Sequence, residues 1–127
     1  MRKQYHFRPS ARGLLAWDVD RLISLSQDLS PIEVPLTAIR EIDQPYWFST
    51  GESATCRAVM EHAALITAAN LSYPIILSSD GRVMDGMHRV LKACLAGLST
   101  IAAVQFQDDP APDYVGVSPD ELPYDEH

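Results

Sequence analysis

The chain has 127 residues and a mass of 14.1 kDa, which is the size of a single domain. Hydrophobic residues make up 46% of the sequence, so the composition excludes wholesale disorder, and no apolar run reaches the ~18 residues of a membrane span. The net charge of -7 argues against a generic nucleic-acid-binding protein. The N-terminus is basic but no apolar stretch follows it, which predicts no secretory signal and a cytoplasmic location.

The net charge arises at the C-terminal end. Residues 105–127 contain seven acidic residues and no Lys or Arg, whereas residues 1–104 contain ten of each sign. Residues 1–12 hold a basic excess of Arg2, Lys3, Arg8 and Arg12. We expect this basic arm to neutralise the acidic tail or to be solvated; contact with a phosphate is the alternative. The acidic tail is also a candidate surface for a protein partner.

In chain order, the first predicted element is a helix over residues 14–29, where apolar residues cluster on one side. Its predicted apolar side consists of Leu15, Val19, Leu22, Ile23, Leu25 and Leu29. Pro31 ends this helix, and residues 32–36 predict a short strand. Residues 37–53 are irregular and contain Tyr46, Trp47 and Phe48, which either pack on the core or cover a site.

A second helix is predicted over residues 54–70, with Ser53 as its N-cap. Its predicted buried stripe is Val59, Ala63, Ile66 and Ala69 or Asn70. His62 lies beside this stripe and is interpreted mainly as a hydrogen-bonded structural histidine, with a place near the site as the alternative. Cys56 and Cys94 are predicted to be buried free thiols, because two cysteines make no disulfide framework.

The segment 73–106 carries the most regular pattern. It predicts a strand at 73–78, a turn at 79–81, a strand at 82–84, a helix at 87–96 and a strand at 100–106. We expect Gly97 at the C′ position of that helix, and the helix to bury Val90, Leu91, Cys94 and Leu95. The proline-rich tail is predicted to be either disordered or extended along the surface. The organisation is therefore an arm and helix (1–30), a core (31–107) and a tail (108–127).

Residues 83–89 form the one motif with clear chemical content: a strand ends, a glycine permits a tight turn and a helix begins. The free N–H groups and positive dipole of a helix start favour an anion. Gly86 permits close approach, Arg89 offers a planar fork of donors, and His88 offers a donor or a base. Lys92 lies four residues after His88, on the same helical face. These residues, with the backbone of Met87, predict a phosphate-binding site.

Asp85 is the residue that a simple phosphate site does not explain, because a carboxylate repels phosphate. It has three readings: a ligand of Mg²⁺ that bridges phosphates, a general base for an attacking hydroxyl, or a structural carboxylate that caps the helix or pairs with Arg82 or Arg89.

The series from YPIIL through DGMHR to AAVQF resembles the ParB/sulfiredoxin superfamily over residues 31–107. The resemblance implies an α+β fold in which a small mixed sheet has flanking helices. It also implies binding of ATP, ADP or CTP with Mg²⁺ at the helix start. The box Asp85-Gly86-Met87-His88-Arg89 is most similar to the Asp-Gly-His-His-Arg of free-serine kinases. Met87 stands where sulfiredoxins have their catalytic Cys, so a Cys-dependent sulfiredoxin activity is not expected.

By the same resemblance, an acidic residue after the first strand takes part in catalysis, and Glu41 is the first candidate, with Asp43 second. The sequence therefore favours a nucleotide-binding protein that transfers a phosphoryl group to a small hydroxyl substrate, with Asp85, His88 and Glu41 as the catalytic candidates. The alternatives are a non-catalytic nucleotide sensor or partner-binding module, and a ParB-like partition or DNA-associated protein.

Overall fold

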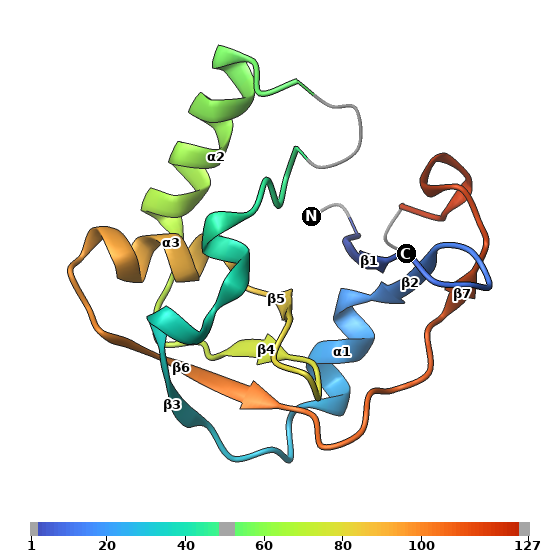
Figure 1. The fold of residues 1–127 in the computed structure, drawn as a ribbon, viewed down its shortest axis with the longest axis horizontal. Coiled ribbons are helices and arrows are strands. Elements are labelled where there is room, and N and C mark those ends of the chain that lie inside the picture. Colours follow the sequence, from blue (N-terminus) through green and yellow to red (C-terminus); the bar gives the residue numbers. More distant parts are fainter. Residues whose placement is uncertain (1–2, 49–52, 125–127) are drawn as a thin grey trace.

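The computed structural model describes residues 3–48 and 53–124, so Arg2, Gly51, Asp125 and Glu126 lie outside the described residues. Its centre is a four-stranded sheet in the order β3-β6-β4-β5; α3 (Met87–Leu95) packs on this sheet, and α2 (Cys56–Ala68) packs on α3, as Figure 1 shows. The strands are β3 (Ile32–Pro35), β4 (Ile75–Leu77), β5 (Val83–Asp85) and β6 (Thr100–Gln105). The β4–β6 pair is parallel, and β3–β6 and β4–β5 are antiparallel. The predicted α+β class with a small mixed sheet is confirmed.

Alternate residues of these strands face two separate cores, because successive side chains of a strand point to opposite faces. Ile75, Leu77 and Val83 belong to the core that also contains Val90 and Ala93 of α3. Ile76, Met84 and Val104 face the other core, with Trp17 and Leu22. Since both faces of the sheet are covered, its strands read as short apolar runs rather than as alternating ones.

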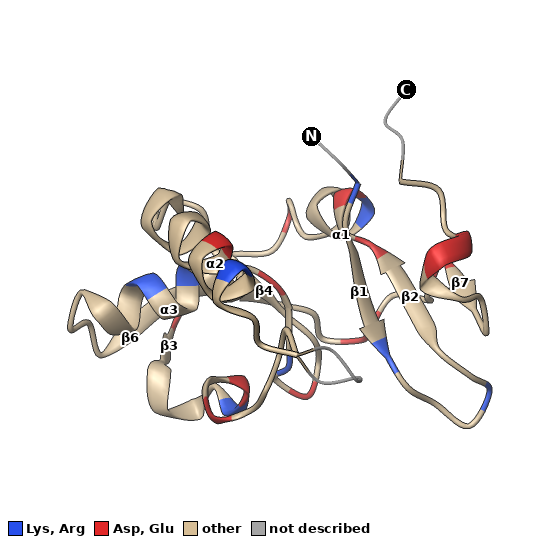
Figure 2. Ribbon diagram, turned by 90° about the horizontal axis from the view of Figure 1, so that it is seen from above, with Lys and Arg blue, Asp and Glu red and all other residues tan. Residues whose placement is uncertain are grey.

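A second sheet, in the order β1-β2-β7, contains two strands from the N-terminal part of the chain and one from the C-terminal part. Its strands β1 (Tyr5–Arg8), β2 (Leu15–Asp18) and β7 (Tyr114–Val115) lie beside the rest of the molecule in Figure 2, and all pair antiparallel. The tail is thus extended along the surface as far as residue 124, which confirms the second of the two predicted alternatives. Arg8 pairs with Asp109 of the tail at 3.4 Å, as predicted for the arm, whereas Lys3 pairs with Asp18 at 2.9 Å.

The predicted helix over 14–29 is wrong in its first half. Residues 15–18 form β2, and α1 runs only over Val19–Leu25, with the Asp18 side chain as its N-cap and Ser26 as its C-cap. Pairing on both edges of β2, with β1 and β7, outweighs the helical pattern of this segment. The buried residues of α1 are Val19 and Leu22, whereas Ile23 and Leu25, which the pattern also predicts as buried, are 41% and 45% exposed.

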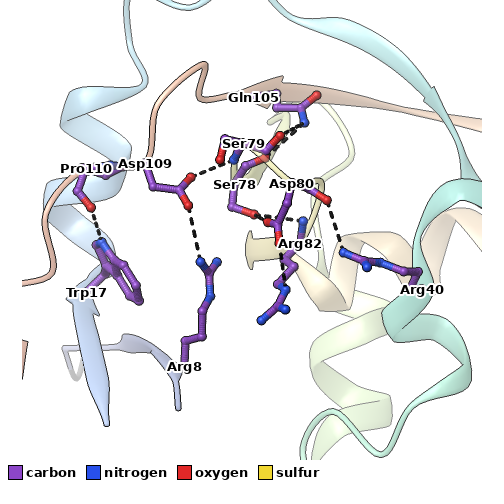
Figure 3. A network of polar contacts seen from close by, with 10 residues as sticks. All are labelled: Arg8, Trp17, Arg40, Ser78, Ser79, Asp80, Arg82, Gln105, Asp109 and Pro110. Atoms are coloured by element: carbon purple, nitrogen blue, oxygen red, sulfur yellow. Dashed lines mark hydrogen bonds and ion pairs between the residues drawn. The ribbon is translucent and has the colours of Figure 1, made fainter. Parts of the chain in front are cut away.

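A network of polar contacts ties the two sheets together around the β4–β5 turn (Figure 3). Asp109 accepts a 2.7 Å hydrogen bond from the Ser79 amide while its other oxygen pairs with Arg8. Trp17 donates from Nε1 to the Pro110 carbonyl at 2.8 Å, and Gln105 donates to the Ser78 carbonyl at 3.1 Å. The tail is therefore held by specific bonds to both sheets.

Several predicted burials are wrong. Thr55 rather than Ser53 caps α2, and no residue of α2 is fully buried. Val59 is 53% exposed, and the half-buried positions of α2 are Ala58, His62, Ile66 and the cap residue Ala69. Cys56, Cys94 and Leu95 are exposed. α2 packs on α3, and Trp47 and Phe48 lie against its His62, so the buried side of this helix follows His62 rather than Val59.

Candidate functional site

The turn from β5 into α3 requires glycine. Gly86 is the N-cap of α3 and has φ of 108°, in the left-handed region. A Cβ at this position would lie 2.6 Å from Cγ2 of Ile75 and 2.7 Å from the Arg89 guanidinium. Backbone conformation and close packing therefore both exclude a side chain, and Asp85 and Arg89 are brought to the same side of the turn.

Asp85 and Arg89 form an ion pair across one turn of the chain. Arg89 donates from Nη2 to Oδ2 of Asp85 at 3.1 Å, and each side chain is 19% exposed. Arg89 also donates to the Pro74 carbonyl at 3.4 Å, and its Nε is buried with no partner in the described part of the chain. Arg89 is one of the two partners named for a structural Asp85, and Nε of Arg89 remains without a partner among the described residues.

This ion pair lies at the edge of a cavity of about 460 Å³, which we call the α1–α3 cavity. Its size is in the range of small-molecule sites. Its polar side chains are Ser26, Gln27, Asp85 and Arg89. Its apolar lining is Ile23, Leu29, Pro31, Tyr73, Pro74, Ile76 and Val104. Of the predicted site residues, Asp85 and Arg89 line this cavity.

His88 does not line the cavity but belongs to an aromatic cluster on the α2 side of α3. Its Nε2 lies 2.9 Å from Nδ1 of His62, and Trp47 stacks on it with ring centroids 4.5 Å apart. Burial lowers the pKa of His88, and the neighbouring His62 and Arg89 lower it further, while Asp85 opposes them. The neutral imidazole is therefore favoured. Tyr46 and Trp47 pack against the core, which is the first of the two predicted roles for this segment.

The side chains of Met87 and Lys92 do not line the α1–α3 cavity. The side chain of Met87 is buried in the core. Only its backbone N–H is therefore a candidate for contact with a phosphate. The Lys92 ammonium donates to the carbonyls of Thr67 and Ala69, at 2.9 and 2.6 Å. It thus binds the last carbonyls of α2, which have no partner within that helix. The structure assigns Lys92 a capping contact and places it outside the α1–α3 cavity.

Glu41 is buried at a different place. Its Oε2 accepts a 2.5 Å hydrogen bond from the Val83 amide, and its Oε1 is buried without a partner among the described residues. With Arg40, Gln44 and Arg82 it lines a second, smaller cavity of about 240 Å³. Burial raises the pKa of Tyr46 to about 12, and the carboxylates of Glu41 and Asp85 both contribute. Tyr46 therefore lies near both acids, but Asp85 and Glu41 do not share a cavity.

The residues of this region suit a nucleotide-bound Mg²⁺ better than a metal held by protein alone. In the described ranges 3–48 and 53–124, no group of three or more His, Cys, Asp or Glu could hold a metal ion. Magnesium, however, is commonly held by one or two carboxylates together with substrate phosphates, and Asp85 supplies one carboxylate at the cavity.

Two features of the site could hardly be predicted from the sequence. One wall of the cavity comes from Ile23, Ser26, Gln27 and Leu29, which lie more than 50 positions before the motif. The cluster of Trp47, His62 and His88 joins a loop and two helices. For His62 a signal exists, since it lies four residues from both Ala58 and Ile66 in the half-buried stripe of α2.

Comparison with family models, curated proteins and solved structures gives no match to this chain. The resemblance to the ParB/sulfiredoxin superfamily therefore remains a prediction from the motif. In the described part of the chain, no helix is long and apolar enough to cross a membrane.

Proposed function

We propose that this protein binds a nucleoside phosphate with Mg²⁺ in the α1–α3 cavity. The observation that carries the proposal is that the two charged residues of the Asp85–Arg89 motif line a cavity with an otherwise mostly apolar wall. A nucleotide needs these two environments, a charged one for its phosphates and an apolar one for its base.

In this proposal the phosphates lie against Arg89 and the start of α3. The Arg89 guanidinium provides the planar donors, and the backbone N–H groups that follow Gly86 are without partners in the helix. Asp85 and the phosphates would hold Mg²⁺, which neutralises phosphate charge and relieves the repulsion by Asp85. Binding would loosen the Asp85–Arg89 ion pair, because both groups gain new partners.

Asp85 also favours phosphoryl transfer as the reaction. It is the one carboxylate that lines the α1–α3 cavity within the described residues, so a small hydroxyl substrate beside it could give its proton to a carboxylate oxygen of Asp85. The substrate oxygen would then bond to the terminal phosphorus, while the bond from that phosphorus to the bridging oxygen breaks and the nucleotide leaves with one phosphate fewer. Glu41 could take part only by a rearrangement, because it lines the other cavity. The alternative of a nucleotide sensor differs in one respect: it would bind the nucleotide without turnover.

The test is thermal unfolding of the protein with ATP, ADP, CTP or GTP, with and without Mg²⁺. A nucleotide at ~100 times its Kd adds about 2.7 kcal/mol to the free energy of unfolding. We expect that stabilisation in the wild type and its loss in Arg89→Ala, with Arg89→Lys intermediate. Arg57→Ala, on the exposed side of α2, is the matched control. Equal stabilisation of wild type and Arg89→Ala, or none in either, would contradict the proposal.

A further inference from the structure

The side of α2 that faces away from α3 is apolar and uncovered. Within α2, the half-buried residues are Ala58, His62 and Ile66, which share one side of the helix because they are four positions apart. The exposed residues on the opposite side, which we call the outer stripe, are Cys56, Met60, Ala63, Ala64 and Thr67. In Figure 1, α2 extends away from the four-stranded sheet, and no element of the described chain covers the outer stripe.

The outer stripe presents apolar groups where a solvent-facing helix normally carries charged ones. Met60 is 60% exposed, and Val59 at the margin of the stripe is 53% exposed. The Thr67 hydroxyl donates to the Ala63 carbonyl at 3.1 Å, so the polar side-chain group of the stripe is already bound within the helix. An uncovered apolar patch of this kind commonly marks an interaction surface.

Arg57 and Glu61 form a charged margin along the outer stripe. They are the only Asp, Glu, Lys or Arg residues of α2, and they lie four positions apart on one side of the helix. Both are exposed, and neither makes an ion pair or a hydrogen bond within residues 3–48 and 53–124. A margin with one charge of each sign is complementary to itself, because a two-fold rotation that reverses the helix brings Arg57 of each copy toward Glu61 of the other.

We propose that the outer stripe of α2 is the contact surface of a homodimer, in which two copies of α2 pack antiparallel about a two-fold axis near Met60. Met60 then contacts Met60 of the other copy, and Cys56 lies opposite Ala64 of the other copy. A parallel pair would instead set Arg57 level with Arg57 and Glu61 level with Glu61, so the charges favour the antiparallel pair. This inference is independent of the proposed function.

The size of the surface predicts a weak dimer. α2 has 13 residues and is therefore about 20 Å long. One face of such a helix buries less than the roughly 800 Å² per partner of a standard interface, so we expect a Kd of about 1 μM or higher.

The first experiment is sedimentation velocity of the full chain at concentrations from about 1 μM to 1 mM, which spans the range of a weak interface. We expect the wild type to pass from monomer to dimer over this range. Met60→Glu should raise the Kd at least about tenfold, because it sets two carboxylates against each other at the two-fold axis. Leu25→Glu, at a residue that is 45% exposed on α1, is the matched control and should dimerise as the wild type does.

A charge exchange tests the partner and its direction. Arg57→Glu alone and Glu61→Arg alone should each raise the Kd about tenfold, because each places like charges together. The double variant Arg57→Glu with Glu61→Arg restores opposite charges and should return the Kd to within about threefold of the wild type. Circular dichroism of each variant checks that α2 is retained.

A disulfide gives the register. With Cys94→Ser to remove the other thiol, Ala64→Cys should form, on oxidation with diamide, a dimer linked from Cys56 of one copy to position 64 of the other. Positions 56 and 64 of one chain are about 12 Å apart along the helix, too far for a disulfide within the chain. Ala68→Cys in the same background, one turn further along the exposed side of α2, should give much less of this product.

Three results would overturn the proposal. One is a wild type that stays monomeric up to 1 mM, and another is a dimer whose Kd is the same in Met60→Glu. The third is failure of the double charge variant to restore the Kd that the single variants raise. A Cys56–Cys56 link in place of the Cys56–64 link would overturn the antiparallel arrangement. None of these results bears on nucleotide binding at the α1–α3 cavity.

Discussion

The imidazoles of His62 and His88 lie side by side on one face of the Trp47 indole. Their centroids are 5.2 Å apart, and those of Trp47 lie 4.1 Å from His62 and 4.5 Å from His88. The 2.9 Å separation of Nδ1 of His62 from Nε2 of His88 requires one nitrogen to carry a proton and the other to lack it. The pair connects α2, α3 and the loop of Trp47.

The first prediction concerns the pKa of His88, which burial and the neighbouring His62 lower from its usual 6.5. The unfolded chain then binds this proton more tightly than the folded one, so the stability due to neutral His88 is present above pH 6.5 and is lost as the pH falls below it. We expect His62→Gln to raise the pKa of His88, measured by NMR titration of its ring protons. A His88 pKa that stays the same or falls in His62→Gln would contradict this.

The second prediction concerns His6, whose pKa is lowered to about 4 by burial and by Arg8 and Arg82. Its folded pKa lies below the unfolded one, so acidification from pH 6.5 toward 4 costs about 3 kcal/mol of unfolding free energy at this residue. Urea denaturation at several pH values should show that the free energy of unfolding falls less steeply below pH 6.5 in His6→Phe than in the wild type. The same fall in both proteins would show that His6 is not the source of the acid sensitivity.

A third prediction compares two glycines in the left-handed region. Gly86→Ala should cost about 2–4 kcal/mol of stability, because backbone strain adds to a collision 2.6 Å from Ile75. Gly97→Ala carries the backbone strain alone, since nothing lies within 4 Å of its added Cβ, and should cost about 1 kcal/mol. Denaturant unfolding of both variants measures the difference, and equal losses would show that packing at Gly86 adds nothing.

Lys92 provides a fourth test, which separates capping from phosphate binding. Lys92→Met removes two hydrogen bonds to the end of α2 and should cost about 1 kcal/mol while leaving nucleotide affinity unchanged. Amide hydrogen exchange should be faster in the last turn of α2 and unaltered in β4. A tenfold loss of nucleotide affinity with unchanged α2 exchange would instead support the phosphate-binding role predicted from the sequence.

Asp85 is the subject of the fifth prediction, which follows from the proposed phosphoryl transfer. Asp85→Asn should lower turnover by at least about 100-fold, because the general base is lost. It should also weaken nucleotide binding in the presence of Mg²⁺, because a carboxylate ligand of the ion is lost, and keep the binding measured without Mg²⁺. Asp108→Asn, an exposed carboxylate that lines neither cavity, is the control and should keep full turnover. Nucleotide binding without any turnover in the wild type would favour the sensor alternative.

The sequence by itself determined the elements that depend on neighbouring residues. The strand, turn and strand of β4–β5, the helix start at Gly86, the end of α3 at Gly97 and strand β6 all lie within two residues of their predicted positions. The reason is that turn residues, caps and short apolar runs act over a few positions. The pairing of Asp85 with Arg89 follows in the same way, from a spacing of four residues.

Only the tertiary structure decided which segments meet. Leu15–Asp18 has a helical pattern but forms β2, because β1 and β7 offer it hydrogen bonds on both edges. Val59 belongs to a predicted buried stripe but is 53% exposed, because α2 turns the stripe of Ala58, His62 and Ile66 inward instead. The α1–α3 cavity exists because Gln27, Tyr73 and Arg89, distant in sequence, converge at one place. Local patterns carry no information on such long-range contacts, which depend on how the whole chain packs.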